Sequence, residues 1–459
     1  MLRGESNKVA ERPMEKKESL PSCILLAQSL MMSSVSVLAV FLALVASALV
    51  ARCIQWFHER SQCRRLVGHQ IEKSRQIADF SFLNAKALED RLRLRAKPNT
   101  RLVMAFGLDN SFTTYDRQVH QEFLKRAKNA IRLVHTEKWI KLGEDTRTVL
   151  DLCLHRFKDE LPSVPLAPML RLVSFSLVLR VLFDVELSTI DLDEATKATD
   201  AINRLWIQSK NRHFIPSAYD KKLLNNALGR LLPHESLHDD CTGPLNLIMP
   251  AYETLWRVVL LTFVSIASRA VDPGTMEELQ EAVKNVPQCF CKNNDAEMRA
   301  LAIAKEGLRL YPPTKRIYRA MSTTDDEGGV VVADVEACHR DWDVWGNDAL
   351  QFKPTRFHNW SHEDATKTSG HATQLGLHTR DREKLSYFPF GVGKHLCPAA
   401  AGFGEKMIAL LVVELTRRFG TRQTGLEIHF GDVEIQQRVC TPLPSGRSDM
   451  ENWVLEAKG

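Results

Sequence analysis

Hydrophobic and polar residues are distributed unevenly along the chain. From Ser19 to Ala51 no side chain is formally charged, and Ile24–Val50 is mostly apolar. This run exceeds the about 20 residues that cross a bilayer. The core of a cleaved signal peptide, the alternative for such a segment, is usually about 7–15 residues long. The pattern therefore favours one transmembrane helix near the N-terminus.

The rest of the chain has mostly helical periodicity. The stretches with helical spacing, some of them broken, are Leu152–Val185, Asp191–Arg230, Thr275–Val286 and Glu405–Phe419. A turn entering a short strand is predicted at 328–333. We therefore predict a mainly α fold with a small β component. It divides into a tail (1–18), an anchor (19–51), a linker with a shortened N-terminal region (52–108) and one large domain (109–459).

Composition narrows the class of protein only in part. The 459 residues are 44% hydrophobic and can bury a sizeable core, and the net charge is +5. This modest positive charge suits an acidic protein partner or an anionic lipid surface. Basic residues are scattered, and no phosphate-binding loop or serine nucleophile motif is present. The sequence therefore predicts no nucleic-acid partner.

One cysteine near the C-terminus has an unusual setting, Phe390-x-x-Gly393-x-His395-x-Cys397. Glycines allow a tight turn, and a helix opening near Pro398 would point N–H groups at the sulfur and favour a thiolate. The alternative is a small buried thiol without chemistry. The spacing resembles the haem-binding loop of the cytochrome P-450 family. That resemblance implies that Cys397 is the axial ligand of haem iron and that Phe390, Gly393 and His395 lie at the haem.

Two further motifs occur before the cysteine in the order that the family has them. Glu306 and Arg309 lie three positions apart and share a helix face. On a surface, such a pair would be an ordinary salt bridge. The pair resembles the family's Glu-x-x-Arg helix, and Phe352–Phe357 looks like its Phe-x-Pro-x-Arg segment. The resemblance implies a buried structural triad of Glu306, Arg309 and Arg356 behind the haem.

The segment Pro250–Thr254 precedes a long apolar run. An acid and a hydroxyl inside a buried helix are costly unless they have partners or a function. The segment resembles the family's oxygen-side helix, with Pro250 and Ala251 in place of the usual small residue and glycine. Glu253 and Thr254 would then be the catalytic proton-delivery pair. The alternative is a helix cap or an ordinary buried threonine.

A competing motif is His234-Glu235-Ser236-Leu237-His238, which fits the His-Glu-x-x-His pattern of zinc metalloproteases. It would make the protein a membrane-anchored protease. Pro233 before the motif and a polar segment with glycine and proline after it predict a loop rather than the helix that zinc binding requires. A zinc site at His234 and His238 is therefore disfavoured.

The resemblance implies haem b as cofactor and insertion of one oxygen atom into an apolar small molecule. Electrons would come from NADPH through a flavoprotein reductase, because the chain has no dinucleotide motif. The protein would be a single-pass protein of the endoplasmic reticulum membrane with a cytosolic catalytic domain. It looks most like fungal members that act in secondary metabolism. A haem-thiolate isomerase or dehydratase without reductase, and a non-catalytic haem-binding protein, remain open.

Contacts to the haem propionates are less evident in the sequence. The family's helix that offers Trp and Arg to a propionate is not recognisable. His120, Lys125 and Arg126 are substitutes for it, and His395 stands where the family often has Arg. The sequence therefore predicts a propionate contact from His395 first.

Overall fold

A computed structural model describes thirteen segments of the chain. They are residues 42–55, 68–83, 85–132, 136–160, 163–211, 213–236, 242–269, 273–285, 295–323, 329–358, 360, 379–437 and 442–456. The chain divides into two units, Met1–Leu66 and Val67–Gly459. The second unit begins at Val67, within the range 52–108 that the sequence analysis describes as a linker with a shortened N-terminal region.

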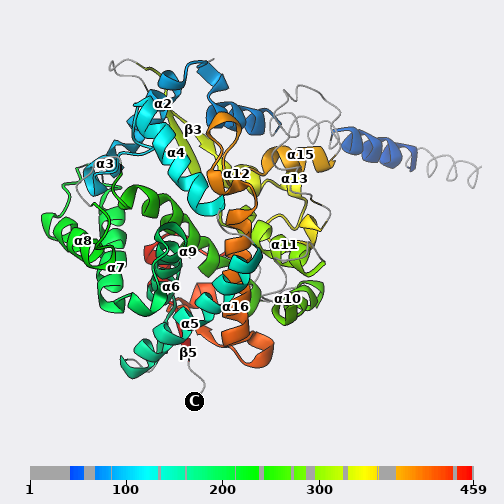
Figure 1. Ribbon diagram of the computed structural model, residues 1–459. Helices are drawn as coiled ribbons and strands as arrows, with labels where there is room; N and C mark the ends of the chain where they lie inside the picture. The colour runs from blue at the N-terminus through cyan, green and yellow to red at the C-terminus, as the bar shows by residue number, and fades with distance from the viewer. Residues whose placement is uncertain are drawn as a thin grey trace, which may run out of the picture. The chain divides into compact units, whose positions relative to one another are not determined.

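The second unit is mostly helical (Figure 1). Its longer helices are α2 (Leu88–Ala96), α3 (Thr100–Phe106), α4 (Arg117–Arg132), α5 (Thr136–Glu160), α6 (Leu166–Phe183), α7 (Leu192–Gln208), α8 (Ala218–Leu231), α9 (Leu245–Ser268), α10 (Pro273–Asn285), α11 (Asp295–Leu310), α15 (Thr379–Ser386) and α16 (Phe403–Phe419). Three short helices are α12 (Val335–His339), α13 (Trp342–Trp345) and α17 (Val433–Gln437). The predicted mainly α fold is confirmed.

Helices α6 and α9 form the centre of the core and pack against each other. Both are long and apolar enough to span a membrane, but 72% of the apolar window of each is buried inside the protein. A helix that is apolar on all sides is stable in water only when neighbouring elements cover it. Helices α11 and α16 supply that cover for α9 on another side. We therefore assign α6 and α9 as core helices.

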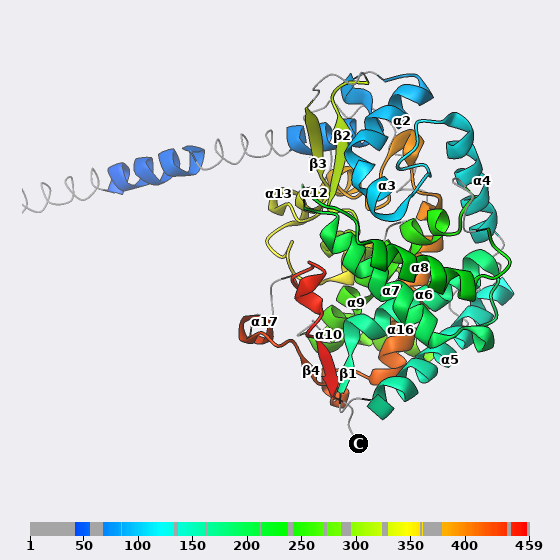
Figure 2. The same ribbon diagram turned by 90° about the vertical axis from the view of Figure 1, so that its left-hand side faces the viewer.

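Two small antiparallel sheets complete the unit. Strands β2 (Arg316–Ala320) and β3 (Val330–Asp334) form a hairpin, and the predicted strand ending at Ala333 is part of it. The other sheet has the order β1-β5-β4, with β1 (Ser163–Pro165), β5 (Val454–Glu456) and β4 (Ile428–His429). Figure 2 shows the hairpin beside α2 and the second sheet at the opposite end. This pairing holds the C-terminal segment at the start of α6.

The other predicted helices follow the hydrophobic pattern closely. The stretch 152–185 contains the end of α5 and the whole of α6, and 191–230 contains α7 and most of α8. Helix α11 ends at Leu310, two residues before Pro312, because the residue that precedes a proline is disfavoured in a helix. Helix positions could therefore be predicted well from periodicity and proline.

The predicted membrane anchor falls mostly outside the described residues, since 1–41 are not among them. Its described end belongs to an apolar helix, Leu42–Gln55. All residues of this helix are exposed in the structure.

Candidate active site

The loop before Cys397 turns at two glycines. Gly391 and Gly393 have φ angles of 77° and 68°, in the left-handed region that glycine adopts most readily. The Cys397 amide donates a hydrogen bond of 3.0 Å to the carbonyl oxygen of Phe390. The loop therefore closes on itself, with the cysteine at its end.

The chain after the cysteine differs from the sequence-based expectation. The sequence predicts a helix that opens near Pro398, but the structure has one 3-10 turn there, and α16 begins at Phe403. Burial raises the pKa of the Cys397 thiol, and the Ala399 amide and Arg95 lower it only in part. A thiolate at this position therefore depends on a bound metal ion, which deprotonates a coordinating thiol.

Phe390 packs against α16 at a glycine. A Cβ atom on Gly404 would lie 2.8 Å from the Phe390 ring, whereas carbon atoms in contact are about 3.5–4.0 Å apart. The ring keeps its position only because residue 404 has no side chain. The loop motif predicts Phe390 but not Gly404, since their contact depends on how α16 leaves the loop.

Glu306, Arg309 and Arg356 form one cluster. Arg309 Nε and Nη2 donate to the Glu306 carboxylate at 2.7 and 2.8 Å, and both side chains are fully buried. Arg356 Nε lies 3.7 Å from Glu306 Oε1, and the Lys353 amide donates to the same oxygen at 2.8 Å. The carboxylate of Glu306 is thus the centre of a buried charged cluster, and the surface salt-bridge alternative does not apply.

His339 joins this cluster to the cysteine loop. Arg309 Nη1 donates to the His339 carbonyl at 2.9 Å, and the Phe388 amide donates to His339 Nε2 at 3.0 Å. Burial lowers the pKa of His339 to about 3, with Arg309 adding to the effect, so the ring stays neutral and can accept this hydrogen bond. No local motif predicts this role of His339, because Arg309 and Phe388 lie 30 and 49 positions away from it in the sequence.

Basic side chains gather around His395. Arg91 Nε lies 3.3 Å from His395 Nε2, and Arg95 Nη1 lies 3.4 Å from His395 Nδ1. The ring of His120 is 5.5 Å from that of His395, between centroids. A neutral imidazole has only one acceptor nitrogen, so the two guanidinium groups cannot both donate to it. Among the described residues, no carboxylate forms an ion pair with Arg91 or Arg95.

This cluster is strongly electropositive. Burial, Arg95 and the other nearby cations hold the pKa of His395 at about 2. Burial and the two arginines lower the pKa of His120 to about 4, and burial lowers that of Arg95 to about 10. An anion would relieve this repulsion and satisfy the extra donors. Haem carries propionate carboxylates, so the residues present fit a haem whose propionates lie at Arg91, Arg95 and His395.

The sequence-based propionate candidates have different outcomes. His120 lies in the cluster, whereas Arg126 donates to the Thr242 carbonyl at 2.6 Å and Lys125 pairs with Glu122 on the surface. The arginines of α2 were not predicted, because α2 lies in 52–108, which was described from the sequence as a linker with a shortened N-terminal region.

Helix α9 accommodates Pro250 by using a neighbouring loop. The proline has no N–H, so the Asn246 carbonyl loses its helical partner. Asn110 Nδ2 donates to that carbonyl at 3.0 Å, and the Asp109 amide donates to Asn246 Oδ1 at 2.9 Å. Thr254 Oγ donates to the Pro250 carbonyl at 2.8 Å. The loop before α4 therefore replaces the missing hydrogen bond and fixes the helix next to Thr254.

Glu253 is buried and pairs with Arg447 from the C-terminal segment. Arg447 Nη1 lies 3.3 Å from Glu253 Oε1, and the guanidinium lies 4.7 Å from the Trp206 ring and 5.6 Å from that of Trp256. Burial lowers the pKa of Arg447 to about 9, so it is still charged at neutral pH. The sequence predicted Glu253 but missed its counterion, which lies 194 residues later in the chain.

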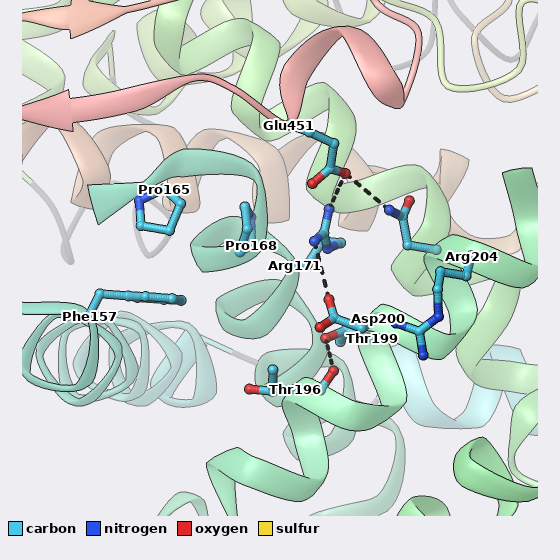
Figure 3. A pocket seen from close by; sticks show the side chains of 10 residues that line it. Phe157, Pro165, Pro168, Arg171, Thr196, Thr199, Asp200, Arg204 and Glu451 are labelled. Carbon is cyan, nitrogen blue, oxygen red and sulfur yellow. Dashed lines mark hydrogen bonds and ion pairs between the residues drawn. The ribbon is translucent and has the colours of Figure 1, made fainter. Parts of the chain in front are cut away.

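A cavity of about 410 Å³ lies between α6, α7 and the C-terminal segment (Figure 3). On its wall, Arg171 donates to Glu451 at 2.6 Å and to Asp200 at 3.3 Å. Asn203 donates to Glu451 at 3.0 Å and accepts from Arg447 at 3.2 Å. Because Arg171 has two carboxylate partners, we assign this polar network to holding the C-terminal segment and Arg447 in place.

The predicted residues of α9, Glu253 and Thr254, and those of the cysteine loop form two separate groups. Within the part of the chain that the structure describes, neither Glu253 nor Thr254 makes a hydrogen bond to the cysteine loop. The competing zinc motif has no described helix. Helix α8 ends at Leu231, His234 lies in the turn that follows, and His238 lies outside the described residues.

Comparison with known proteins agrees with this site. Residues 245–427 match the family model "Cytochrome P450". Cytochrome P-450 71A20 of Arabidopsis thaliana is 30% identical over 224 residues, which cover 44% of this chain and 41% of that protein. Indoleacetaldoxime dehydratase of the same plant is 32% identical over 156 residues, or 30% of this chain and 28% of its own. The chain thus matches less than half the length of these curated relatives.

Solved structures support the fold as well. CYP175A1 from Thermus thermophilus is 17% identical, with a TM-score of 0.53 over 83% of this chain and 87% of that one. The haem domain of cytochrome P-450DA is 15% identical, with a TM-score of 0.51 over 80% and 85% of the two chains. Identities this low bear on the fold alone. The matched segment 245–427 contains α9, Cys397 and the Glu306 cluster, and over this segment the chain is similar to the cytochrome P-450 family, whose members bind haem b.

Proposed function

We propose that the chain is a haem-thiolate monooxygenase that inserts one oxygen atom from O2 into an apolar small molecule. One observation carries the proposal. The partly buried thiol of Cys397 lies at a cluster of buried arginines that has no described carboxylate partner. A thiol beside unpaired cations suits a group that carries both a metal ion and carboxylates, as haem b does. The family match over 245–427 supports the same cofactor.

Residues of the cysteine loop and of its neighbouring elements have different roles in holding haem b. Cys397 ligates the iron, while Arg91, Arg95 and His395 bind the propionates. Glu306, Arg309 and Arg356 hold the segments that support the loop. One of these segments contains His339, which accepts the hydrogen bond from the Phe388 amide. When bound, a haem with a thiolate ligand supplies oxygen activation, because the thiolate pushes electron density toward the iron.

Glu253 and Thr254, both on α9, transfer protons. The Thr254 hydroxyl has its proton directed to the Pro250 carbonyl, and rotation about one bond would direct it elsewhere. Glu253 is held as a carboxylate while Arg447 pairs with it, since a nearby cation favours the charged form. Glu253 can therefore carry a proton only after this pair opens.

Electrons would come from NADPH through a separate flavoprotein reductase. Exposed Arg117, Lys125, Lys128 and Arg132 lie on α4, which contains Glu122 as its one acid. A helix of this charge suits an acidic partner. Helix α4 also carries His120 of the cation cluster at Cys397, so electrons would enter close to the haem.

The predicted anchor and the exposed apolar helix Leu42–Gln55 support attachment to a lipid membrane. We place the protein in the endoplasmic reticulum membrane as a single-pass protein with a cytosolic catalytic domain, where a reductase can reach it. The motif combination of 250–254, 333–341 and 397–399 supports a fungal secondary-metabolite enzyme. The curated relatives named above are plant proteins.

A second candidate is a haem-thiolate dehydratase or isomerase that needs no reductase. The ion pair between Glu253 and Arg447 favours it, because a carboxylate held by a guanidinium has no proton to deliver. One relative, the indoleacetaldoxime dehydratase, carries such an activity in its name. A haem protein without turnover is the remaining alternative.

The test is coupled turnover in membranes that contain a P-450 reductase. We expect haem-dependent NADPH consumption, with a larger share of electrons lost to hydrogen peroxide in Thr254→Ala. The matched control is Ser268→Ala, since Ser268 donates to the carbonyl four residues before it at 2.7 Å on the same helix. Full coupling in Thr254→Ala would contradict the proton role. Haem-loaded protein that turns over a substrate without NADPH would favour the dehydratase.

A further inference from the structure

A group of cations surrounds Trp206 at the end of α7. The guanidinium of Arg101, from α3, lies 4.9 Å from the Trp206 ring, and that of Arg447 lies 4.7 Å from the same ring. Arg101 Nη1 donates to the Ser209 hydroxyl at 2.7 Å. Lys210 is the next residue along the chain. Three segments that are distant in sequence therefore bring positive charge to one place.

Two of these cations have no carboxylate partner within the described segments. Arg447 pairs with Glu253, but the contacts of Arg101 are a hydroxyl and an indole face. The charged groups that lower the pKa of Lys210, after burial, are the cations Arg447, Arg257, Arg101 and Lys315. Like charges at this density repel one another, so the group is more stable with an anion bound than without one.

Arg257 adds a donor at the same place. Its Nη2 donates to the Ser445 carbonyl at 2.8 Å, while its Nε is buried without an acceptor. Burial lowers the pKa values of Arg101 and Arg257. Burial and the four neighbouring cations lower that of Lys210.

The cation group lies next to the predicted proton-delivery residues. Arg447 contacts Glu253, and Arg257 lies one helical turn beyond it on α9. The neighbourhood is otherwise aromatic. The Phe106 ring is 6.2 Å from that of Trp206, between centroids, and Trp256 is fully buried beside Arg447. A ligand bound here would place an anionic group on the cations and an apolar body along α9.

We propose that the substrate is an apolar carboxylic acid whose carboxylate is bound by Arg101 and Lys210, with Arg257 as an additional donor. This inference rests on the proposed monooxygenase function and narrows its substrate class. Charge-assisted hydrogen bonds to a carboxylate give both affinity and a fixed orientation.

The test uses the haem-loaded full chain and pairs of probes that differ only in charge. Octanoate, dodecanoate and hexadecanoate are each titrated against their methyl esters, and binding is followed by the shift of the Soret band without turnover. We expect one or more of the acids to bind at least about tenfold more tightly than its ester. Rising ionic strength should reduce this preference.

The variant Arg101→Gln/Lys210→Gln should reduce the preference to about one while leaving the affinity of the esters unchanged. The matched control is Lys197→Gln/Lys222→Gln. It also removes two positive charges, one from α7 and one from α8, and should keep the preference for acids. Unchanged ester binding shows that the variant is folded.

Three results would overturn the inference. Equal Soret responses to acids and esters, or no response to any probe, would exclude carboxylate recognition. An unchanged preference in the double variant would place that recognition elsewhere. If the double variant lost binding to phosphatidylserine vesicles but kept its preference for acids, the cations would belong to a membrane-binding surface. A thiolate-type carbon monoxide spectrum in the same sample separates these failures from failure of the proposed function.

Discussion

Removal of Arg309 tests the buried cluster behind the cysteine loop. In Arg309→Met, the Glu306 carboxylate keeps Arg356 at 3.7 Å and one amide, but loses two hydrogen bonds at 0% exposure. Breaking a buried ion pair in this way costs about 3–5 kcal/mol. Total stabilities are about 5–15 kcal/mol. We therefore expect a large loss in the free energy of unfolding and a low haem content per purified chain.

The assay is urea unfolding followed by far-ultraviolet circular dichroism, together with haem stoichiometry. The control is Arg316→Met, which removes an arginine with 59% side-chain exposure, 3.2 Å from Asp334. Exposed pairs contribute about 0–1 kcal/mol, so this variant should resemble the wild type. A further variant, Glu306→Met/Arg309→Met, should be more stable than Arg309→Met alone, because no buried carboxylate is left unpaired. An Arg309→Met protein within about 1 kcal/mol of the control, and fully loaded with haem, would refute the reasoning.

Three other variants give independent checks. Gly404→Ala should lower haem retention, measured as the rate of haem transfer to apomyoglobin, because its Cβ would lie 2.8 Å from the Phe390 ring. Since burial lowers the folded pKa of His339 to about 3, its contribution is present above pH 6.5 and is lost as pH falls toward 3. Its replacement in His339→Gln should therefore reduce the loss of unfolding free energy between pH 6.5 and 5.5 by about 1 kcal/mol. Arg447→Met should let Glu253 take up a proton, seen as a new carboxylic-acid band in the infrared spectrum at neutral pH; no new band would contradict the ion pair.

Local motifs predicted those site residues whose partners lie only a few positions away in the sequence. The glycines of the cysteine loop and the pair of Glu306 and Arg309 depend on spacings of two or three positions, which the sequence displays directly. Helix bounds followed from the apolar period and from proline, as at the end of α11. These features are fixed by local backbone geometry.

Long-range partners could not be found in the same way. Arg91 and His395 lie 304 positions apart, and Glu253 and Arg447 lie 194 apart. No short motif records such a pairing, because it arises only when α2 and the C-terminal segment pack on the helical core. The turn after Cys397 was also misjudged as the start of a helix. Its backbone is set by how α16 packs against Phe390 at Gly404, a tertiary contact.

The most direct test of the account is the absorption spectrum of the purified, dithionite-reduced protein under carbon monoxide. Cys397→Ala is compared with Cys153→Ala, which removes a buried thiol elsewhere in the core. The account predicts a strongly red-shifted Soret band in the wild type and in Cys153→Ala, and its loss in Cys397→Ala. An unchanged band in Cys397→Ala, or folded wild-type protein without any haem band, would contradict the assignment of Cys397 as the iron ligand.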